Sequence, residues 1–384
     1  MTLSFKNKIL LFTFFVVLIT SLWVNNIYLL FGFSVLCWIF IPQKKWWDNL
    51  TVSLLLFSLF YGFMIIMNGK VNSNFNLFSY MIAPVAFYRF GRWSMNIFKE
   101  EKSRQKFLMF SIFLYLLYFL ILTFKDISLV GIVNPTRVLL GDLGDDHAKA
   151  ATLYGLMASV GIGCICVVFA KKENFGLRMG FIALALLAML GVIHLVNRTG
   201  VAIFVICIVF SFFISTKFNI PKMFGALFVL LILVFVVLQI GLVDQNVLDA
   251  YAQREEMGTY DASSMGGRSG MWVSAVGDMF VNPFGWKPIG YTFAHNMWLD
   301  IARVSGLLAF IPFLASTILH CNNLLKLLRN KYLTNFAVVI LSINMAMLLS
   351  SFVEPVIEGS LLFFCLLMMI WGITKSLAME NKLK

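Results

Sequence analysis

The chain has 384 residues, of which 60% are apolar, 16% aromatic and 12% charged, and its formal net charge is +12. A soluble protein carries about 25% charged residues, so the composition excludes a water-soluble enzyme, a disordered chain and a disulfide scaffold. The apolar runs are continuous, and helices satisfy their own backbone hydrogen bonds in lipid. The composition therefore predicts an all-α, polytopic integral membrane protein.

About twelve apolar runs are long enough to cross roughly 30 Å of hydrocarbon as helices. They lie near 8–22, 27–42, 50–67, 75–90, 107–124, 148–170, 179–196, 201–216, 223–243, 296–319, 333–352 and 360–374. If the N-terminus is cytoplasmic, most of the 30 Lys and Arg residues fall in the inside segments. This bias predicts that both termini are cytoplasmic, so the positive charge indicates topology and not nucleic-acid binding.

Two outside segments are longer and more polar than the rest, and we expect them to be periplasmic loops. They run over 125–147 and 244–295 and hold half of the 18 acidic residues. We expect a single membrane domain over 1–384, with function facing outward through these loops. In the second loop, an apolar face from Trp272 to Phe280, ended by Asn282-Pro283, predicts a short amphipathic helix. It either lies on the membrane surface or packs on the bundle.

Arg198 stands between two apolar spans with almost no loop. A charge within the membrane is costly, so Arg198 is either a turn residue that reaches the headgroups or a fixed cation that lines a water-filled cavity for a phosphate. His194 is four residues earlier and on the same helical face. His194 is a candidate substrate-site residue that orients Arg198, and simple packing is the favoured alternative.

Arg268 and His295 are the candidates in the larger loop. Glycines on both sides of Arg268 let the backbone approach a ligand closely, and a guanidinium matches phosphate oxygens. His295 comes at the outer end of a span, where an imidazole suits proton transfer near neutral pH; a capping or interfacial role is the alternative. Asn296 beside it is a candidate substrate contact.

Other polar residues on the outer side are weaker candidates. Asp300 and Arg303 are three apart and are expected to pair inside the bundle. Glu354 and Glu358 bracket a proline in the last outer loop and either contact a sugar or keep the turn solvated. The first loop holds a cluster with poor geometry for a metal, so we expect no metal site: Arg137, Asp142, Asp145, Asp146, His147 and Lys149.

Taken together, these motifs resemble the O-antigen ligase and polymerase superfamily of bacterial envelope glycan transferases. The resemblance covers the whole topology, but its motifs are confined to about 194–306. They are Asn197-Arg198-Thr199-Gly200 at an outer turn, Gly267-Arg268 with Trp272 after it, Asn282-Pro283-Phe284-Gly285, His295-Asn296, and Gly306.

The resemblance implies a fold of the membrane glycosyltransferase class called GT-C, and transfer of a glycan from undecaprenyl diphosphate to an acceptor sugar at the periplasmic face of the inner membrane. It implies no cofactor and no metal. Arg198 and Arg268 then clamp the diphosphate, and His295 accepts or orients the proton of the attacking hydroxyl. Arg137 adds to the donor site. The family's Gly-x-Gly after the proline is replaced here, and Lys287 in that stretch is a candidate phosphate contact.

The partners implied are the lipid-linked donor, membrane lipids, and either a growing glycan or the lipid A–core as acceptor. A chain-length regulator protein is a further expected partner, and nucleic acid is not. A polymerase is slightly favoured over a ligase because the outer loop is compact. A twelve-helix transporter or flippase is the alternative from another class, and it predicts repeated halves and broken helices. We expect Arg198, Arg268 and His295 to converge on one outward cavity.

Overall fold

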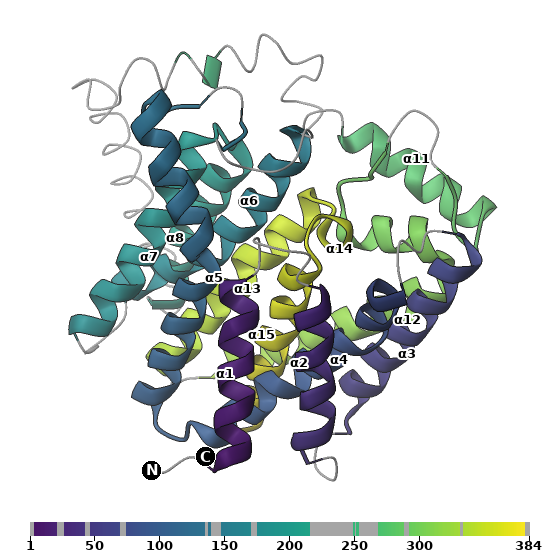
Figure 1. Cartoon of the computed structure of the whole chain (residues 1–384), viewed down its shortest axis with the longest axis horizontal. Coiled ribbons are helices and arrows are strands. Elements are labelled where there is room, and N and C mark those ends of the chain that lie inside the picture. The colour runs from purple at the N-terminus through teal and green to yellow at the C-terminus, as the bar shows by residue number, and fades with distance from the viewer. Residues whose placement is uncertain are drawn as a thin grey trace.

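The structure is a computed structural model that describes residues 4–20, 27–42, 47–69, 74–134, 137–139, 147–169, 175–215, 249, 251–252, 268–287, 292–330 and 333–380. All the regular elements in these residues are helices, as the sequence predicts. They form a bundle with a slanted outer wall (Figure 1).

The helices follow one another with short connections. Their bounds are α1 Phe5–Ile19, α2 Ile27–Phe40, α3 Asn49–Met67, α4 Asn74–Ile97, α5 Glu101–Val130, α6 His147–Ile162, η1 (a 3₁₀ helix) Gly163–Phe169, α7 Phe175–His194, α8 Arg198–Ser215, α11 Arg268–Val281, α12 Met297–Leu328, α13 Asn335–Val353, α14 Val356–Gly359 and α15 Leu361–Glu380. The expected spans fall on these helices, except 223–243, which lies outside the described residues. Because α5 runs on to Val130, the first outer loop begins later than the expected residue 125.

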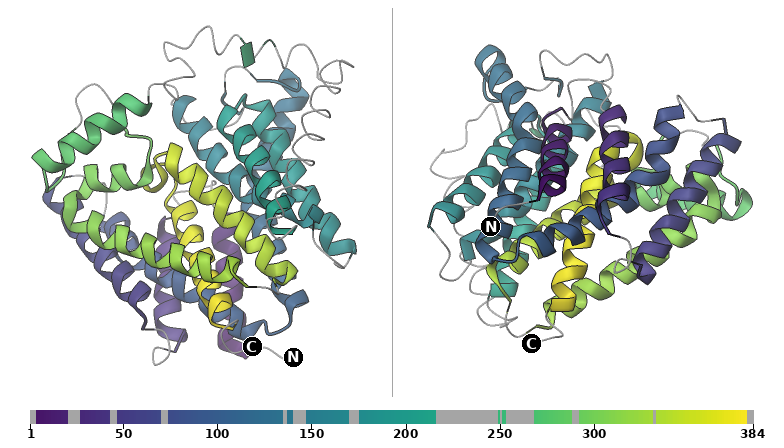
Figure 2. Two further views of the ribbon diagram at one scale, coloured as in Figure 1. Left: turned by 180° about the vertical axis from the view of Figure 1, so that it is seen from behind. Right: turned by 60° about the horizontal axis from the view of Figure 1, so that its bottom comes forward.

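Six of these helices, α3, α5, α7, α12, α13 and α15, are long and apolar enough to cross a membrane. Three shorter apolar helices, Ile27–Phe40, Thr152–Val168 and Arg198–Ile214, accompany them. The chain is therefore a helical membrane protein by length and composition, and the number twelve stays a prediction. The spanning helix α15 is enclosed by the others in both views (Figures 1 and 2), and 83% of its apolar window is buried.

The outward faces of the spanning helices carry large apolar side chains. Exposed examples are Leu56, Leu59, Phe63 and Ile66 in α3, Phe110, Phe113, Ile121 and Phe124 in α5, and Ile311, Leu314 and Ile318 in α12. Soluble proteins rarely expose contiguous apolar surface of this extent. Hydrocarbon is the solvent that fits these faces.

The bundle has two distinct ends. At one end, the start of α5 meets the end of α15, where Arg104 pairs with Glu380 at 2.6 Å. The start of α13 lies there too, since the backbone N–H of Phe336 donates to Glu101 Oε1. Figure 1 places the start of α1 at this end and α11 and α14 at the opposite end. The candidate residues of the sequence motifs therefore gather away from the end at which α1 begins.

The amphipathic helix predicted in the larger loop is confirmed as α11, and it ends before Asn282-Pro283. Its buried side, Ala275 and Met279, packs against α12 and the adjoining loop. Part of the expected apolar face points outward instead, with Val273 75% and Phe280 69% exposed. Helix α11 thus packs on the bundle along one edge and presents apolar side chains along the other.

Helix α12 is interrupted at Gly306, whose φ of 67° and ψ of −171° are not helical. The neighbouring loop fills the interruption, because the N–H of Leu307 donates to Pro283 O and the N–H of Trp286 donates to Arg303 O. A side chain on Gly306 would overlap Pro283 and Phe284, with a Cβ only 2.2 Å from the Pro283 oxygen. Glycine at this position lets the loop after α11 seat directly in the broken turn.

The closest helix contact joins α4 and α15 through two glycines. A Cβ on Gly372 would lie 2.1 Å from Tyr88 O, and one on Gly91 would lie 2.0 Å from Met369 O. Small residues of this kind let membrane helices approach closely. The contact sets the spacing of α15, which carries the packing of α12 and α13.

We predict that Gly372→Ala lowers the apparent melting temperature of the full chain in detergent. Because the obstacle is backbone, the helices must separate, at a cost of about 1–3 kcal/mol or more. Gly32→Ala is the matched control, since no atom lies within 4 Å of its added Cβ. Equal melting temperatures for the two variants contradict the proposed close contact.

Candidate functional site

The loop that carries His295 is folded around Asp300. One carboxylate oxygen of Asp300 accepts the N–H of Ala294 at 2.8 Å, and the other accepts the N–H of Asn296 at 3.3 Å. His295 between them has a φ of 51°, a conformation that residues with side chains rarely adopt. Such strain persists only where surrounding contacts impose it, and it is commonly found at functional sites.

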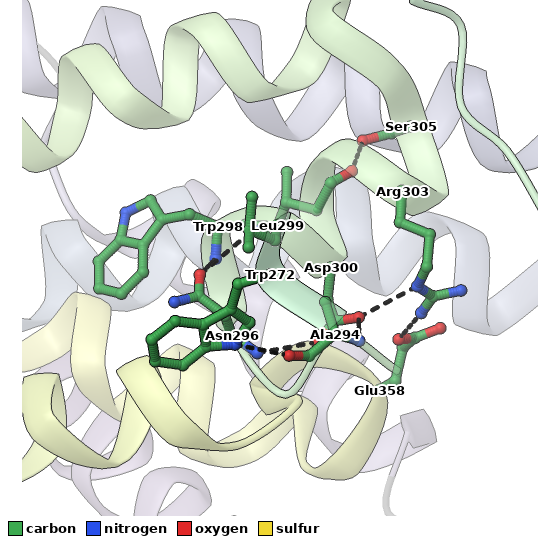
Figure 3. Close-up of polar contacts among 10 residues, drawn as sticks. Trp272, Ala294, Asn296, Trp298, Leu299, Asp300, Arg303, Ser305 and Glu358 are labelled. Carbon is green, nitrogen blue, oxygen red and sulfur yellow. Dashed lines mark hydrogen bonds and ion pairs between the residues drawn. The ribbon is translucent and has the colours of Figure 1, made fainter. Parts of the chain in front are cut away.

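Arg303 completes this arrangement (Figure 3). Its Nε donates to Asp300 Oδ1 at 3.0 Å, and its Nη2 pairs with Glu358 of α14. The Arg303 guanidinium also lies 5.5 Å from the centre of the Phe293 ring. The predicted pairing of Asp300 with Arg303 is confirmed, and Glu358 contacts this buried pair.

Asn296 caps α12, and its side chain is used structurally. Its Oδ1 accepts the N–H groups of Trp298 and Leu299, and its Nδ2 donates to Phe352 O at 3.2 Å. Asn296 therefore joins the start of α12 to the end of α13. Its expected substrate contact stays a prediction.

Glu354 is the residue through which the two main candidates meet. It follows α13 and is 7% exposed. Arg268 Nη2 lies 3.3 Å from Glu354 Oε1, and His295 Nδ1 lies 3.6 Å from Glu354 Oε2. Thr152 of α6 donates to the same Oε2 at 3.2 Å. A single carboxylate thus brings together a guanidinium and an imidazole from separate segments of the larger loop.

Arg137 belongs to the same charge cluster through space. Burial lowers the pKa of its guanidinium from the usual value, the Glu354 carboxylate opposes this, and the positive charge of Arg268 adds to it. Its φ of 63° is left-handed, and its buried Nε has no hydrogen-bond partner among the described residues. We call Glu354, Arg268, His295 and Arg137 the Glu354 cluster.

Arg198 is the first residue of α8, after a turn in which Val196 has a φ of 49°. Its Nη2 donates to the backbone oxygen of Tyr251 at 3.3 Å. Within the described residues, no contact joins Arg198 to Glu354. The expected convergence is therefore direct for Arg268 and His295 only.

Two further candidates occupy different surroundings. His194 is fully buried, and its ring nitrogens face Asp126 Oδ2 and Ile132 O. This arrangement agrees with the packing alternative, and the role in substrate binding is not tested. Lys287 is exposed at the end of the loop that fills the break in α12.

Metal binding was considered for the first outer loop. Among the described residues, no group of three His, Cys, Asp or Glu side chains is placed to hold a metal ion. Asp145 and Asp146 lie outside the described residues.

Chemically, the Glu354 cluster suits an anion. Two guanidinium groups outnumber one carboxylate, so an incoming phosphate competes with Glu354 for Arg268 and Arg137. The neighbouring imidazole can hold or release a proton. Glu354 was noted in the sequence only as a sugar contact or a solvated turn residue, and the signal that pointed to it was an acid before a proline in an outer loop.

No protein-family model matches this chain, and no curated protein matches it. The family expected from the motifs stays a prediction, and the functional conclusion depends on the site.

We predict that Glu354→Gln tightens the binding of inorganic diphosphate to the full chain. Removing the competing negative charge leaves Arg268 and Arg137 to the anion, and we expect a gain of about tenfold, or ~1.4 kcal/mol. Calorimetry at low salt measures it. Glu358→Gln is the control, since Glu358 pairs with Arg303. Unchanged affinity in Glu354→Gln speaks against an anion site here.

Proposed function

We propose that this protein is a membrane glycosyltransferase that moves a glycan from undecaprenyl diphosphate to an acceptor sugar hydroxyl at the outer face of the membrane. The observation that carries the proposal is the Glu354 carboxylate shared by Arg268 and His295. It joins a candidate phosphate-binding cation and a candidate base at one end of a membrane bundle. The family resemblance of the motifs supplies the substrate class.

The leaving group of this reaction is a lipid diphosphate, so the transition state gains negative charge on the oxygen that leaves the sugar. Fixed cations in a partly buried site stabilise such charge well. Arg268 and Arg137 are suitable, because arginine stays protonated and offers a planar fork to phosphate oxygens. The reaction then needs no metal ion or other cofactor, as the family resemblance implies.

In the proposed step, the acceptor hydroxyl oxygen attacks the anomeric carbon of the donor sugar. The bond from that carbon to the phosphate oxygen breaks, and the diphosphate leaves with its electron pair. His295 takes the hydroxyl proton on Nε2, because Nδ1 faces the Glu354 carboxylate and is held as the protonated nitrogen. The 3.6 Å separation is longer than a hydrogen bond, and such contacts commonly tighten when substrate binds.

The remaining candidates take supporting roles. Arg198 supplies a further cation from the start of α8, and Lys287 is an additional phosphate contact on the exposed loop. Asn296 fixes the start of α12 beneath His295. His194 acts from within the protein and is treated below.

Within this chemistry, a polymerase of surface polysaccharide is slightly favoured and a ligase to lipid A–core is the alternative. The two share the donor and differ in the acceptor. A polymerase would have a chain-length regulator protein as partner. We place the protein in the bacterial inner membrane, with both termini cytoplasmic and the Glu354 cluster periplasmic.

A transporter is the alternative from another class, and the broken helix α12 is the feature that favours it. In transporters, the free backbone groups of a broken helix hold the substrate. Here the break at Gly306 is occupied by Pro283 and Trp286 of the chain itself, and Asn68 donates to Val304 O beside it. The break therefore offers less to a ligand than the Glu354 cluster does.

We predict that Arg268→Ala and His295→Ala each reduce glycan transfer by about 100- to 1,000-fold, the usual effect of losing one such group. The assay uses the purified full chain in lipid nanodiscs with a defined undecaprenyl-diphosphate-linked repeat unit. Product ladders indicate a polymerase, and single transfer to lipid A–core indicates a ligase.

Arg329→Ala is the matched control, because this exposed arginine caps the opposite end of α12. Full transfer by both Arg268→Ala and His295→Ala would refute the site. In cells that lack the protein, lipid-linked units that accumulate in the inner leaflet identify a flippase, whereas accumulation in the outer leaflet agrees with a transferase.

A further inference from the structure

A buried pair of ionisable side chains lies apart from the Glu354 cluster. His194 is the last residue of α7 and Asp126 lies near the end of α5. Both are fully buried, and His194 Nε2 lies 2.8 Å from Asp126 Oδ2. The proposed reaction does not require either residue to touch substrate. A pair of this kind inside an apolar bundle calls for a physical reason.

The protons of this pair follow from its neighbours. His194 Nδ1 lies 2.9 Å from Ile132 O, and a carbonyl oxygen only accepts, so Nδ1 carries a hydrogen. The other nitrogen, Nε2, faces a carboxyl group. A satisfied arrangement therefore has a proton between Nε2 and Asp126, which makes the pair neutral as a whole. Neutrality suits a site without water, and the pair forms a rigid bridge between α5 and α7.

Asn134 extends the bridge to the turn that carries Arg137. Its Nδ2 donates to Asp126 Oδ2 at 2.5 Å and to Val138 O at 2.8 Å. Its backbone N–H donates to His194 O at 2.7 Å, and its carbonyl accepts the N–H of Arg137 at 3.2 Å. These four contacts hold a turn in which Arg137 has left-handed backbone geometry, a conformation that needs such support.

The turn that carries Arg198 begins at the same histidine. After His194, the N–H of Asn197 returns to Val192 O at 2.9 Å, and Asn197 Oδ1 accepts the N–H of Gly200 at 3.0 Å. Between them, Val196 has a positive φ, which is unusual for a β-branched residue. Two strained turns that each present an arginine are thus fastened to one imidazole.

We propose that the Asp126–His194–Asn134 network is a positioning device that fixes the spacing of Arg137 and Arg198 for the two phosphates of one diphosphate. The inference rests on the proposed function, since it assigns both arginines to the same lipid-linked donor. His194 is then a positioning residue that acts through the arginines, and Arg137 and Arg198 contact the ligand. Two cations held at a fixed spacing bind without ordering the loops first.

The bundle contains a comparable network that carries no arginine turn. His320 Nε2 lies 2.9 Å from Asn344 Oδ1, and Asn344 Nδ2 donates to Thr374 Oγ1 at 2.9 Å. It joins α12, α13 and α15 and serves here as the matched control. A network that only holds helices together is expected to affect stability and not donor binding.

Asn134→Ala is the main test, because it removes the link to the turn and leaves the His194–Asp126 pair in place. We expect the KM for the lipid-linked donor to rise about 10- to 100-fold, the effect of a misplacement of the order of 1 Å, with a smaller change in kcat. Asn344→Ala lowers the melting temperature but keeps the donor KM within about twofold.

Double variants separate positioning from general stability. If the network acts through the arginines, Asn134→Ala costs less than about threefold once Arg137→Ala or Arg198→Ala is present. A loss that persists in full in either background overturns the proposal. An effect of Asn344→Ala on donor KM equal to that of Asn134→Ala overturns it as well.

Hydrogen exchange gives a readout that does not depend on glycan transfer. We expect the amides of Asn134 and Arg137 to exchange at least about tenfold faster in Asn134→Ala, and to be unchanged in Asn344→Ala. Unchanged exchange in Asn134→Ala overturns the positioning device. If the wild-type chain transfers no glycan while this exchange result holds, the proposed function fails and the role of the network in holding the turn stands.

Discussion

The constraint on which this structure depends is that polar groups inside an apolar bundle must be satisfied by the protein itself. The charged side chains meet it by pairing at the two ends. At the end where α1 begins, Arg92 pairs with Asp48 at 2.9 Å and Arg104 pairs with Glu380. At the opposite end the pairs are shared and branched, as where Arg268 and His295 divide one carboxylate.

This difference between the two ends has a physical meaning. A one-to-one ion pair is complete, and an added ligand gains little from it. A carboxylate divided between a guanidinium and an imidazole, with Arg137 close enough to alter the charge balance, leaves cationic groups only partly neutralised. The opposite end is therefore where a charged ligand gains most from entering the protein.

Local sequence patterns predicted what depends on short separations along the chain. The 3.6-residue period gave α11 and its end at Asn282, and the three-residue spacing gave the pairing of Asp300 with Arg303. The apolar runs gave the helices of the bundle. Each of these features depends on neighbours within one or two helical turns, which the sequence displays directly.

Contacts across long separations could not be predicted in this way. Glu354 is 86 residues from Arg268, and His194 is 68 residues from Asp126. Which acid meets which base depends on the packing of α5, α7 and α13, and a single sequence does not specify that packing. His194 also showed how a helical face misleads: Arg198 is four residues away, but a turn ends the helix at His194, and the imidazole points to α5.

The N-terminus of α12 lies between two groups of opposite charge balance. On one side, Arg268 and Arg137 outnumber Glu354; on the other, Asp300 and Glu358 outnumber Arg303. Under the proposed function, a diphosphate and a sugar have matching needs, since phosphate oxygens accept hydrogen bonds and sugar hydroxyls donate them to carboxylates. His295 stands where these groups meet, held in its strained conformation by Asp300. A donor whose diphosphate lies at the cationic group would therefore carry its sugar past the imidazole toward the acidic one.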